Sequence, residues 1–510
     1  MRIEPSSETF TARYSAGEPQ VVWTTLVADL ETPVSAFLKI AAAKTKNSSP
    51  FGFLLESVAG GEVRGRYSII GLEPDVIFRA SGRTAEINRK PHDPEAFVPA
   101  NTEPLQALRE LIAESRIVLP DALPPMAAGI FGYLGYDIVR LLEDSLSTPG
   151  PDPIGIPDAL LVRPRLVVVF DAVEDAITLV TPVRPAAGVT AKAALARAAE
   201  RLSTIVDALD RPLDKSAHGS DGGPLEGTPR SNTTPEEFKR MVLRAKDYIL
   251  AGDIFQVVLS QRFEMPFSLA PFALYRALRR VNPSPYLFFL DFGDFAVAGS
   301  SPEILVKTAG GTVTVRPIAG TRPRGSTPRE DKQLEAELLS DAKERAEHLM
   351  LLDLGRNDVG RVAEIGTVKV TDQFFVERYS HVMHIVSNVQ GRLRQDREPL
   401  DALAAGFPAG TVSGAPKVRA VQIIDELEKE KRSLYAGCVG YFSAVSEMDT
   451  CIVLRTALIK DGMMYVQAGA GIVADSDPDL EQQECVNKAK ALFRAAEEAR
   501  RFASAGSRGQ

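Results

Sequence analysis

The sequence contains little cysteine. Its 510 residues include three cysteines, Cys438, Cys451 and Cys485. This number is odd and the spacing matches no zinc-binding pattern, which excludes a disulfide framework and a structural zinc site. We interpret the three residues as reduced and mostly buried thiols.

The sequence also lacks an excess of positive charge and a long apolar run. The formal net charge is −8 and the pI is near 5.5, so no global basic field would attract the phosphates of a nucleic acid. Apolar runs such as 166–170 are too short to span a bilayer, and the first residues lack the basic-then-apolar order of a secretory signal. We therefore expect a cytoplasmic protein with no nucleic-acid partner and no membrane partner.

The composition is that of an ordinary globular protein, with 45% hydrophobic and 25% charged residues. The length exceeds what one simple core usually organises, so we expect two domains or one very large one. Residues 211–232 are rich in Pro, Gly, Ser, Asp and Lys and almost free of apolar residues, which is typical of a flexible linker. The predicted division is an N-terminal domain at 1–210, this linker, a second domain at 233–500 and a disordered tail at 501–510.

The second domain begins with a clear helix signal. Thr234-Pro235-Glu236-Glu237 is a capping box with proline at the first helical position, and apolar residues follow at helical spacing. Short β-rich runs come next, at 255–259, 286–290, 295–298 and 312–315. The first domain mixes expected helices and strands, at 33–44, 104–114, 68–70 and 166–170. The alternation of both element types predicts an α+β protein.

Two expected helices of the second domain carry pairs of glutamates. The i, i+3 spacing places Glu344 and Glu347 on one face of the first helix. Glu481 and Glu484 share a face of the second helix with Lys488. Because Mg²⁺ takes a few carboxylates plus waters and substrate oxygens, two facing acidic helices could hold a metal that grips an anionic ligand. Such spacing is also common on solvated helix faces, so spacing alone leaves both interpretations open.

Several loops of the second domain combine glycine with serine, threonine and arginine. Glycine lets backbone N–H groups approach an anion closely, as expected at 299–303, 317–322, 408–417 and 468–471. His384 lies in a strand-like run in which alternation places His381 on the opposite face. A histidine suits proton transfer near neutral pH, but a buried structural histidine fits this pattern equally well.

Taken together and in this order, these segments resemble the chorismate-utilising enzymes. Over nearly its whole length the chain is similar to the anthranilate synthase component I members of that family. The most specific matches are 256–260, 301–303, 317–321, 344–361 and 408–417. The resemblance implies an α+β fold in which large, mostly antiparallel sheets pack in layers with helices on the outside. It also implies that 233–500 is the chorismate-binding catalytic domain.

The resemblance further implies an enzyme reaction. The family adds ammonia to C2 of chorismate, expels the C4 hydroxyl and eliminates pyruvate to leave anthranilate, in the first committed step of tryptophan biosynthesis. Mg²⁺ binds the ring carboxylate. By this resemblance, Glu347 and Glu484 are the direct metal ligands, while Glu344 and Glu481 support and orient them.

Other residues match positions with a role in catalysis or binding. Glu303 matches the general acid that protonates the departing hydroxyl, so we expect burial or nearby negative charge to raise its pKa. His384 matches a histidine near the leaving hydroxyl that aids proton movement. The implied substrate-binding residues are Ala319, Gly320, Thr321, Thr411, Tyr435, Arg455, Gly469, Ala470, Gly471 and Lys488.

Two positions distinguish the chain from other members of the family. Gln256 stands where isochorismate and salicylate synthases carry a lysine that activates water, and an amide cannot serve as that base. Ala319 stands where aminodeoxychorismate synthases carry a lysine able to attack C2, and a methyl group is no nucleophile. Both residues favour anthranilate synthase over these alternatives.

In this family ammonia comes from a glutamine amidotransferase, which needs a nucleophilic cysteine together with a histidine and an acidic residue. Neither the length nor the cysteines of this chain provide one. Cys438 lies near glycines, but the alternating strand residues around it favour a structural role. The resemblance therefore implies a separate glutaminase subunit, component II, and a hetero-oligomer.

The resemblance also implies feedback inhibition by L-tryptophan. The residues expected at that site are Leu55, Glu56, Ser57, Arg66, Pro285, Tyr286, Leu287, Val439 and Tyr441. Leu287 and Arg66 depart from the family pattern, in which methionine and lysine are common, and a buried strand ending in a turn explains 54–57 equally well. A catalytically silent tryptophan-binding subunit is a further alternative, but the set Glu303, Glu347, His384 and Glu484 argues against it.

Overall fold

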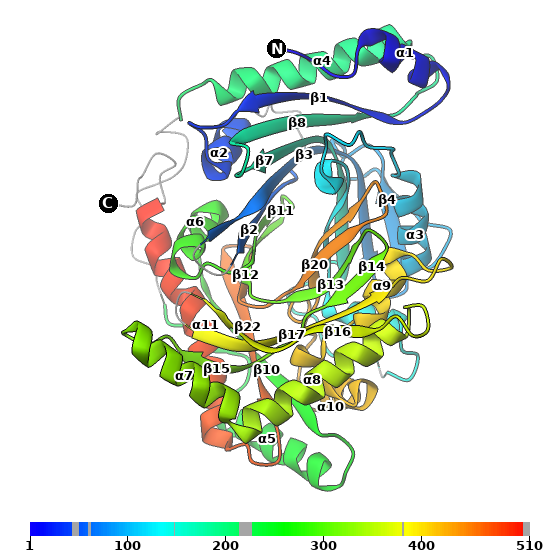
Figure 1. The fold of residues 1–510 in the computed structure, drawn as a ribbon. Coiled ribbons are helices and arrows are strands. Elements are labelled where there is room, and N and C mark those ends of the chain that lie inside the picture. The colour runs from blue at the N-terminus through cyan, green and yellow to red at the C-terminus, as the bar shows by residue number, and fades with distance from the viewer. Residues whose placement is uncertain (43–49, 60–62, 147, 214–226, 380–381, 503–510) are drawn as a thin grey trace.

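Antiparallel strands form the centre of the molecule (Figure 1). The structure, a computed structural model, describes residues 1–42, 50–59, 63–146, 148–213, 227–379 and 382–502. Two long strands, β3 (Val63–Ser81) and β7 (Ala159–Asp171), pair with each other. The sheet divides into two branches from this pair.

The first branch starts at β3 and ends at β10. Its strands pair in the order β2 (Gly52–Ala59), β11 (Tyr286–Asp291), β12 (Phe295–Ser301), β21 (Thr456–Lys460), β22 (Met463–Ile472) and β10 (Gln256–Pro266). The short strands that pair with β10 are β9 (Arg230–Ser231) and β18 (Gly414–Ala415). Because β2 pairs with β11, backbone hydrogen bonds join strands from the two sides of the expected linker.

The second branch starts at β7. Its strands pair in the order β6 (Gly129–Leu134), β19 (Cys438–Ser443), β20 (Met448–Ile452), β13 (Ile304–Ala309), β14 (Thr312–Val315) and β17 (Val382–Arg392). The last of these also pairs with β15 (Ile318–Pro323) and β16 (Lys369–Arg378). At the margins of the central pair lie β8 (Ala176–Val183), β1 (Gln20–Val27), β4 (Thr84–Asn88) and β5 (Phe97–Pro99).

The two branches face each other across a layer rich in aromatic residues. Phe53 of the first branch stacks on Phe131 of the second, with ring centroids 4.6 Å apart. Tyr133, Phe288 and Val297 extend the same cluster, and all these side chains are buried. Burial of such large apolar surfaces is the main stabilising contribution available to a sheet pair of this kind.

Helices cover the outer faces of both branches. Against the first branch pack α2 (Pro33–Ala42), α6 (Pro271–Val281) and α11 (Pro478–Ala499), while α1 (Ser7–Ser15) and α4 (Ala191–Leu209) pack over β1 and β8 (Figure 1). Against the second branch and β10 pack α3 (Pro104–Glu114), α5 (Pro235–Leu250), α8 (Ala342–Gly360), α9 (Pro399–Gly406) and α10 (Lys417–Leu427). The remaining helical segments are α7 (Pro328–Ser340), η1 (Pro125–Ala127), η2 (Tyr136–Leu141), η3 (Gly410–Val412) and η4 (Arg500–Phe502). The predicted α+β fold with layered antiparallel sheets and outer helices is confirmed.

The expected helix start at 234–237 is also confirmed. Thr234 and Glu237 form the capping box of α5, and aspartates at 341 and 477 cap α8 and α11 through backbone N–H groups. The linker and the tail differ from expectation at their edges. Residues 230–231 form strand β9 instead of continuing the linker, and Phe502 is buried although it falls within the expected tail. The segments 214–226 and 503–510 lie outside the described residues.

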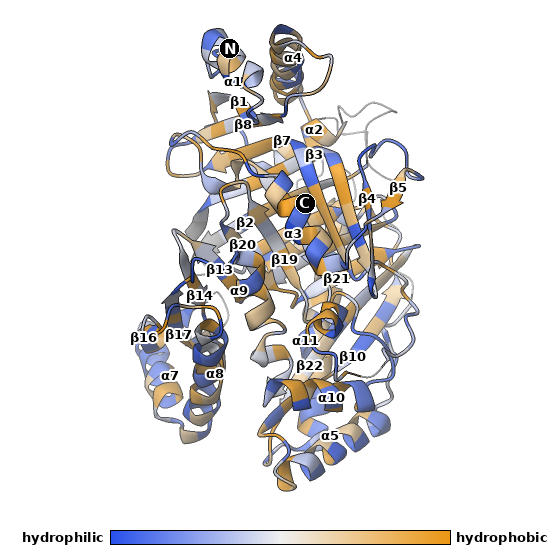
Figure 2. Ribbon diagram, turned by 90° about the vertical axis from the view of Figure 1, so that its right-hand side faces the viewer, coloured by the Kyte–Doolittle hydropathy of each residue, from blue (hydrophilic) through white to orange (hydrophobic). Residues whose placement is uncertain are grey.

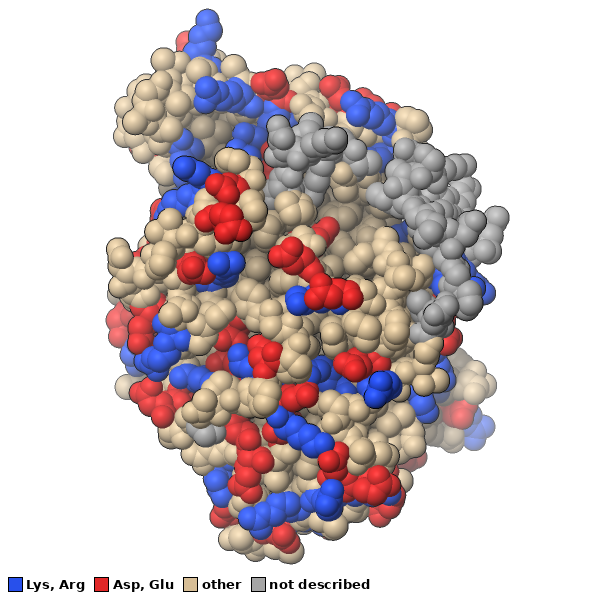
Figure 3. Space-filling model, turned by 180° about the vertical axis from the view of Figure 1, so that it is seen from behind, with Lys and Arg blue, Asp and Glu red and all other residues tan. Residues whose placement is uncertain are grey.

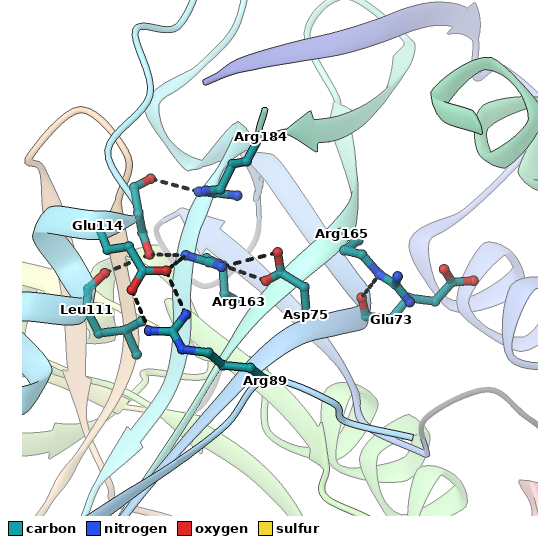
Figure 4. Close-up of polar contacts among 9 residues, drawn as sticks. Glu73, Asp75, Arg89, Leu111, Glu114, Arg163, Arg165 and Arg184 are labelled. Atoms are coloured by element: carbon teal, nitrogen blue, oxygen red, sulfur yellow. Dashed lines mark hydrogen bonds and ion pairs between the residues drawn. The ribbon is translucent and has the colours of Figure 1, made fainter. Parts of the chain in front are cut away.

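A cluster of charged side chains ties the end of α3 to the sheet (Figure 4). Arg163 on β7 is buried and donates to Asp75 at 2.7 Å and to Glu114 at 2.9 Å. Arg89 donates to the same Glu114 carboxylate at 2.6 Å, and Arg184 donates to the backbone carbonyl of Ser115 at 3.1 Å. Since the guanidinium groups also meet the carbonyl end of the helix, the cluster fixes α3 against β3 and β7.

Charges of both signs are interspersed on the face of the molecule shown in Figure 3. No continuous basic area is visible on that face. Of the helices within the described ranges, none combines the length and apolarity that crossing a bilayer requires.

A buried ion pair connects β10 with α10 and the segment after α9. The Arg432 side chain is almost completely buried and donates to Glu428 at 2.6 Å. It also donates to the backbone carbonyls of Val258 and Val412, at 2.6 and 2.7 Å. Burial alone would lower the pKa of this guanidinium, but Glu428 raises the pKa above its ordinary value. Arg432 therefore holds β10, the loop after α9 and the end of α10 together.

Replacement of Arg432 by methionine is expected to destabilise the protein. The change leaves Glu428 buried without its charge partner, which typically costs about 3–5 kcal/mol in the free energy of unfolding. The double variant Arg432→Met/Glu428→Met removes both charges and should be more stable than the single variant. Urea unfolding of all three proteins measures the difference.

The half-exposed Arg244 provides a matched control. Arg244→Met should change the free energy of unfolding by less than about 0.5 kcal/mol, as is usual at surface sites. A double variant that is less stable than Arg432→Met would contradict the assigned role of the pair.

Candidate active site

A cavity of about 430 Å³ lies between the ends of the two branches. In the lower part of Figure 2, α7, α8, β16 and β17 stand on one side, and α5, α10, β10 and β22 stand on the other. Residues from α8, β15 and β17 line one wall of the cavity, and residues from β10, β22 and α11 line the other. Segments that lie far apart in the second half of the sequence therefore meet at this cavity.

The two predicted acidic helices face this cavity. Glu344, Glu347, Glu481 and Glu484 all contribute to its lining. Burial raises the pKa of Glu347, and the negative charges of Glu344 and Glu484 raise it further. Burial and Glu484 likewise raise the pKa of Glu481. The pKa of a carboxyl group rises in this way where negative charges are close together and incompletely neutralised.

Two of these carboxylates are engaged by cations. Arg322 donates to Glu344 at 3.2 Å, and Lys488 lies 2.7 Å from Glu484. Lys488 also donates to the backbone carbonyl of Gly469 at 2.9 Å. Glu347 has a weaker partner, the amide of Gln256 at 3.3 Å. Among the described residues, no cation lies in ion-pair distance of Glu347, in contrast to Glu344 and Glu484.

The carboxylates fit a cation that shares its ligands with water and substrate. Among the described residues, no three His, Cys, Asp or Glu side chains converge tightly enough to hold a metal ion by themselves. A hard cation such as Mg²⁺ prefers oxygen donors, keeps several waters and is often held by one or two carboxylates plus substrate oxygens. The repulsion that raises the pKa of Glu347 is what such an ion would relieve.

Glu303 lies between β12 and β13, with its carboxyl group buried in the cavity wall. Burial raises its pKa to about 8, although the hydroxyl of Thr411 and the backbone N–H of Ile318 act against this rise. The group is therefore largely protonated at neutral pH and can donate a proton. The predicted rise in the pKa of Glu303 agrees with this result, and burial is its cause.

His384 on β17 also lines the cavity. Burial lowers its pKa to about 4, so the imidazole is neutral at pH 7. Its Nδ1 lies 3.0 Å from the carbonyl oxygen of Gly320 and 3.1 Å from the hydroxyl of Thr321. Since a carbonyl only accepts, this contact places the proton on Nδ1 and leaves Nε2 as an acceptor. His381 lies outside the described residues.

Arg455 brings an unpaired positive charge to the cavity. Within the described parts of the chain, no carboxylate lies in ion-pair distance of its guanidinium, and burial lowers the pKa of the group. Its backbone has φ +48°, a left-handed conformation that a non-glycine residue adopts at an energetic cost. A buried arginine without a partner is a strong binding site for a carboxylate.

Gln256 and two glycines shape the wall formed by β10 and β22. A Cβ atom on Gly471 would lie 2.5 Å from Nε2 of Gln256, and one on Gly469 would lie 2.7 Å from the Tyr435 hydroxyl oxygen. A Cβ on Gly469 would also lie 2.8 Å from the backbone carbonyl oxygen of Leu259, so glycine is required there, whereas at Gly471 the end of the Gln256 side chain would have to move. The amide oxygen of Gln256 is buried and has no hydrogen-bond partner among the described residues, so it is available to a ligand.

The other predicted substrate-binding residues divide into two groups. Ala319, Gly320, Thr321, Thr411, Tyr435, Arg455, Gly469, Gly471 and Lys488 all line the cavity. Ala470 does not, because strand alternation on β22 turns its methyl group into the hydrophobic core. The lining also includes Lys343, Gln467 and Ser476, which the sequence analysis missed. Lys343 lies on α8, Gln467 on β22 and Ser476 in the loop before α11. No local sequence pattern would have identified them as lining residues.

The residues expected around tryptophan do not gather in one cavity. Glu56, Ser57 and Leu287 line a hollow of about 320 Å³ beside β2 and β11, where Arg279 donates to Glu56 at 2.7 Å. Four other expected residues belong to the central aromatic layer, namely Leu55, Tyr286, Val439 and Tyr441. Pro285 immediately precedes β11, and Arg66 is half exposed and paired with Asp171 at 2.8 Å. Alternation along β11 separates Tyr286 from Leu287, and on β2 the register is irregular directly after Glu56.

Comparison with known proteins agrees with the geometry of the cavity. A model of the chorismate binding enzyme family matches residues 53–494. Anthranilate synthase component 1 of Cereibacter sphaeroides is 58% identical over 502 residues, which cover 98% of each chain. The protein of the same name from Pseudomonas aeruginosa is 50% identical over 473 residues, which cover 92% of this chain and 94% of the relative.

A solved structure supports the same assignment. Anthranilate synthase component I from Streptococcus pneumoniae aligns with a TM-score of 0.75 and 38% sequence identity, and the alignment covers 92% of this chain and 99% of that chain. The family resemblance inferred from the sequence is therefore confirmed. The chain belongs to the chorismate binding enzyme family and, within it, to the anthranilate synthase component 1 proteins.

Proposed function

We propose that this protein is the large subunit of anthranilate synthase. It converts chorismate and ammonia to anthranilate and pyruvate, the first committed step of tryptophan biosynthesis. The observation that carries the proposal is the cavity in which a protonated Glu303, a neutral His384 and an unpaired Arg455 face an acidic wall. The names of the similar proteins support the same reaction.

The residues of the cavity have separate roles in this proposal. Arg455 binds a substrate carboxylate, because its guanidinium is buried and unpaired within the described residues. Glu303 donates its proton to the departing C4 hydroxyl, and its raised pKa keeps that proton in place until the C–O bond breaks. His384 accepts or relays a proton at Nε2, since Gly320 holds Nδ1.

Mg²⁺ is the proposed cofactor, and when bound it supplies positive charge opposite the substrate's ring carboxylate. Glu347 and Glu484 would hold it directly. Glu344, restrained by Arg322, and Glu481 would orient those two carboxylates. The raised pKa of Glu347 supports its place among the direct ligands.

Two side chains favour ammonia as the nucleophile. The Gln256 amide lies in the cavity beside Glu347 and cannot act as a base toward water. The methyl group of Ala319 also faces the cavity and cannot attack C2. These residues disfavour the isochorismate, salicylate and aminodeoxychorismate synthase reactions.

A separate glutamine amidotransferase subunit is the proposed source of ammonia. All three cysteines of this chain are buried. Burial raises the pKa of Cys438 and of Cys485 to about 12, and raises that of Cys451 well above its ordinary value. A thiol in this condition is not a nucleophile near neutral pH. The complete enzyme is therefore a hetero-oligomer in this proposal.

We further propose that L-tryptophan inhibits the enzyme at the junction of β2, β11 and β19. In the strand register, Tyr286 pairs with Ser57, and Tyr441 lies on the neighbouring branch across the aromatic layer. Tyr286 donates to Asp449 at 3.1 Å, and Asp449 is also paired with Lys307 at 3.1 Å, so this junction combines aromatic surface with charged groups.

The proposed reaction predicts anthranilate as the product. Purified protein should form fluorescent anthranilate from chorismate only when both ammonium and Mg²⁺ are present. Glu347→Gln and Glu484→Gln each remove a charged donor and should lower this rate at least about 100-fold, since metal sites depend strongly on their ligands. Fluorescence and chromatography of the product measure the rate.

Glu497→Gln is the matched control, because Glu497 is an exposed glutamate on the same helix, outside the cavity. Its rate should equal that of the unmodified protein. Consumption of chorismate without formation of anthranilate would refute the proposed function, and normal activity of both variants would refute the metal ligands.

The pKa of Glu303 predicts how the rate depends on pH. The acid must be protonated, so kcat/KM for chorismate should fall as the pH rises above about 8, the pKa of Glu303. Because alkaline pH also raises the fraction of free ammonia, rates are compared at equal concentrations of free ammonia. Glu303→Gln should lower kcat by about 10²–10⁴-fold and abolish this alkaline decrease. A profile that is the same with and without Glu303 would exclude the residue as the acid.

Inhibition by L-tryptophan is tested at Ser57. Ser57→Phe fills space where β2 pairs with β11, and it should raise the concentration of L-tryptophan needed for half-inhibition at least about tenfold. The ammonium-dependent rate without inhibitor should stay unchanged. Ser7→Phe, at an exposed position of α1, is the control. Equal inhibition of the Ser57 variant and the control would place the inhibitor site elsewhere.

A further inference from the structure

His384 lies on the middle one of three neighbouring strands, β15, β17 and β16 (Figure 1). In the strand register it stands opposite Thr321 on one side and Glu377 on the other. Side chains directly opposite each other on antiparallel strands point to the same face, with Cβ atoms about 5 Å apart. Thr321 and His384 line the cavity, whereas Glu377 does not. The imidazole therefore has a carboxylate beside it that lies outside the cavity.

Tyr379 follows β16 directly and packs against the same imidazole. The two ring centroids are 5.5 Å apart and the ring planes meet at 63°, an edge-to-face arrangement. Tyr379 is 6% exposed and does not line the cavity. Its backbone N–H donates to the carbonyl of Val382 at 2.8 Å, and its carbonyl accepts from Arg324 at 2.7 Å. Because edge-to-face contacts have a preferred geometry, the anchored Tyr379 ring restrains the plane of the imidazole.

Two restraints of different kinds therefore act on the imidazole of His384. The carbonyl of Gly320 lies 3.0 Å from Nδ1 and determines which nitrogen carries the proton. A hydrogen bond at one ring atom still lets the ring rock about that bond, and the contact with Tyr379 opposes this motion. Together the two contacts fix the direction of Nε2.

The Tyr379 hydroxyl connects this ring to the carboxylate of Glu377. The hydroxyl donates to Oε2 of Glu377 at 2.9 Å, and Oε1 of the same carboxylate is paired with Arg316. The Arg316 guanidinium also lies 5.6 Å from the ring centroid of Phe375 on β16. Burial and the negative charge of Glu377 raise the pKa of the Tyr379 phenol, so the hydroxyl stays a donor at neutral pH. Glu377 is therefore held at both oxygens, beside His384.

Charges of both signs act on the imidazole. Burial has the largest effect on the pKa of His384 and lowers it, and the positive charge of Arg455 lowers it further. The hydrogen bond to a backbone carbonyl and the negative charge of Glu377 act in the opposite direction. The negative charge of Glu303 reaches the Tyr379 phenol as well. Glu377 is therefore placed to offset the positive charge that uptake of a proton creates on the imidazole.

We propose that Tyr379 is a positioning residue for His384, and that Glu377, held by Tyr379 and Arg316, stabilises the imidazole when it accepts a proton. The inference rests on the proposed function. In that reaction Glu303 gives a proton to the departing hydroxyl and the added ammonia must lose one, so an acceptor such as Nε2 balances the protons. Proton transfer requires the acceptor within hydrogen-bond reach, and small displacements slow it strongly. Glu377 and Tyr379 lie outside the cavity lining and act through His384.

Removal of the Tyr379 ring should slow the reaction without weakening substrate binding. Tyr379→Leu should lower kcat of the ammonium-dependent reaction by about 10–100-fold, as expected for a displaced catalytic group, and leave KM for chorismate within about twofold. Tyr379→Phe keeps the ring contact and should recover most of the lost kcat. Tyr14→Leu is the control, because Tyr14 is about equally buried, stacks on Phe10 and lies on α1 outside the cavity. Initial rates of anthranilate fluorescence measure both constants.

The charge of Glu377 is tested separately. Glu377→Gln keeps an acceptor for the Tyr379 hydroxyl and should lower kcat about tenfold, the effect of a neighbouring charge that shifts a pKa by about one unit. Glu364→Gln is the control, because it removes a carboxylate that is likewise paired with an arginine, Arg392, outside the cavity. If Tyr379→Leu fails to fold, Tyr379→Phe and Glu377→Gln carry the test, and a lower kcat in Tyr379→Phe would overturn the inference.

Nuclear magnetic resonance of labelled histidine gives a readout that does not depend on the reaction. The chain has five histidines, so few signals arise, and His384→Gln identifies the signal of His384. Loss of the ring current of Tyr379 should shift this signal in Tyr379→Leu, whereas Tyr379→Phe and Tyr14→Leu should leave it in place.

The outcomes separate the inference from the proposed function. The positioning role is overturned if Tyr379→Leu leaves kcat or the His384 signal unchanged, or if Tyr379→Phe loses as much kcat as Tyr379→Leu. Unchanged kcat in Glu377→Gln would overturn the role of the charge. If the unmodified protein makes no anthranilate from ammonium, the proposed function itself has failed, and the His384 signal still shows whether Tyr379 holds the ring.

Discussion

The buried Arg432–Glu428 ion pair is the interaction on which the catalytic region depends. Arg432 donates to carbonyl groups of β10 and of the loop that carries Thr411, and its guanidinium carbon lies 4.8 Å from the ring of Tyr136 and 5.5 Å from that of Tyr435. Tyr136 belongs to the N-terminal half of the chain, and Tyr435 lines the cavity. One cation therefore joins both halves of the chain beneath the site.

Burial then determines the protonation states within the cavity. A low-polarity environment disfavours every charged form, so it raises the pKa of Glu303 and lowers those of His384 and Arg455. The same physical effect makes a carboxyl group an acid, an imidazole a neutral acceptor and a guanidinium a strong anion ligand. The opposite wall differs because several carboxylates lie together, and there repulsion between like charges adds to burial.

The strand register connects the proposed inhibitor junction with the proposed acid. Tyr286 on β11 pairs with Ser301 on β12, and Glu303 follows two residues later. The backbone carbonyl of Glu303 also accepts a hydrogen bond from Ile452 at 3.0 Å, at the end of the β19–β20 pair. A ligand that favours one arrangement of these strands over another would move Glu303 with them.

Local sequence patterns were sufficient to predict the helix start at 235, the α+β class and the two glutamate pairs, because caps and helical periodicity act over a few residues. The motifs and their order along the chain were sufficient to identify the family. Only the tertiary structure decided which way each side chain faces: it turned Ala470 into the core, placed Lys343 in the cavity and divided the expected tryptophan residues between two faces. It also decided the pKa of Glu303, since burial depends on strands, helices and loops that are distant in sequence.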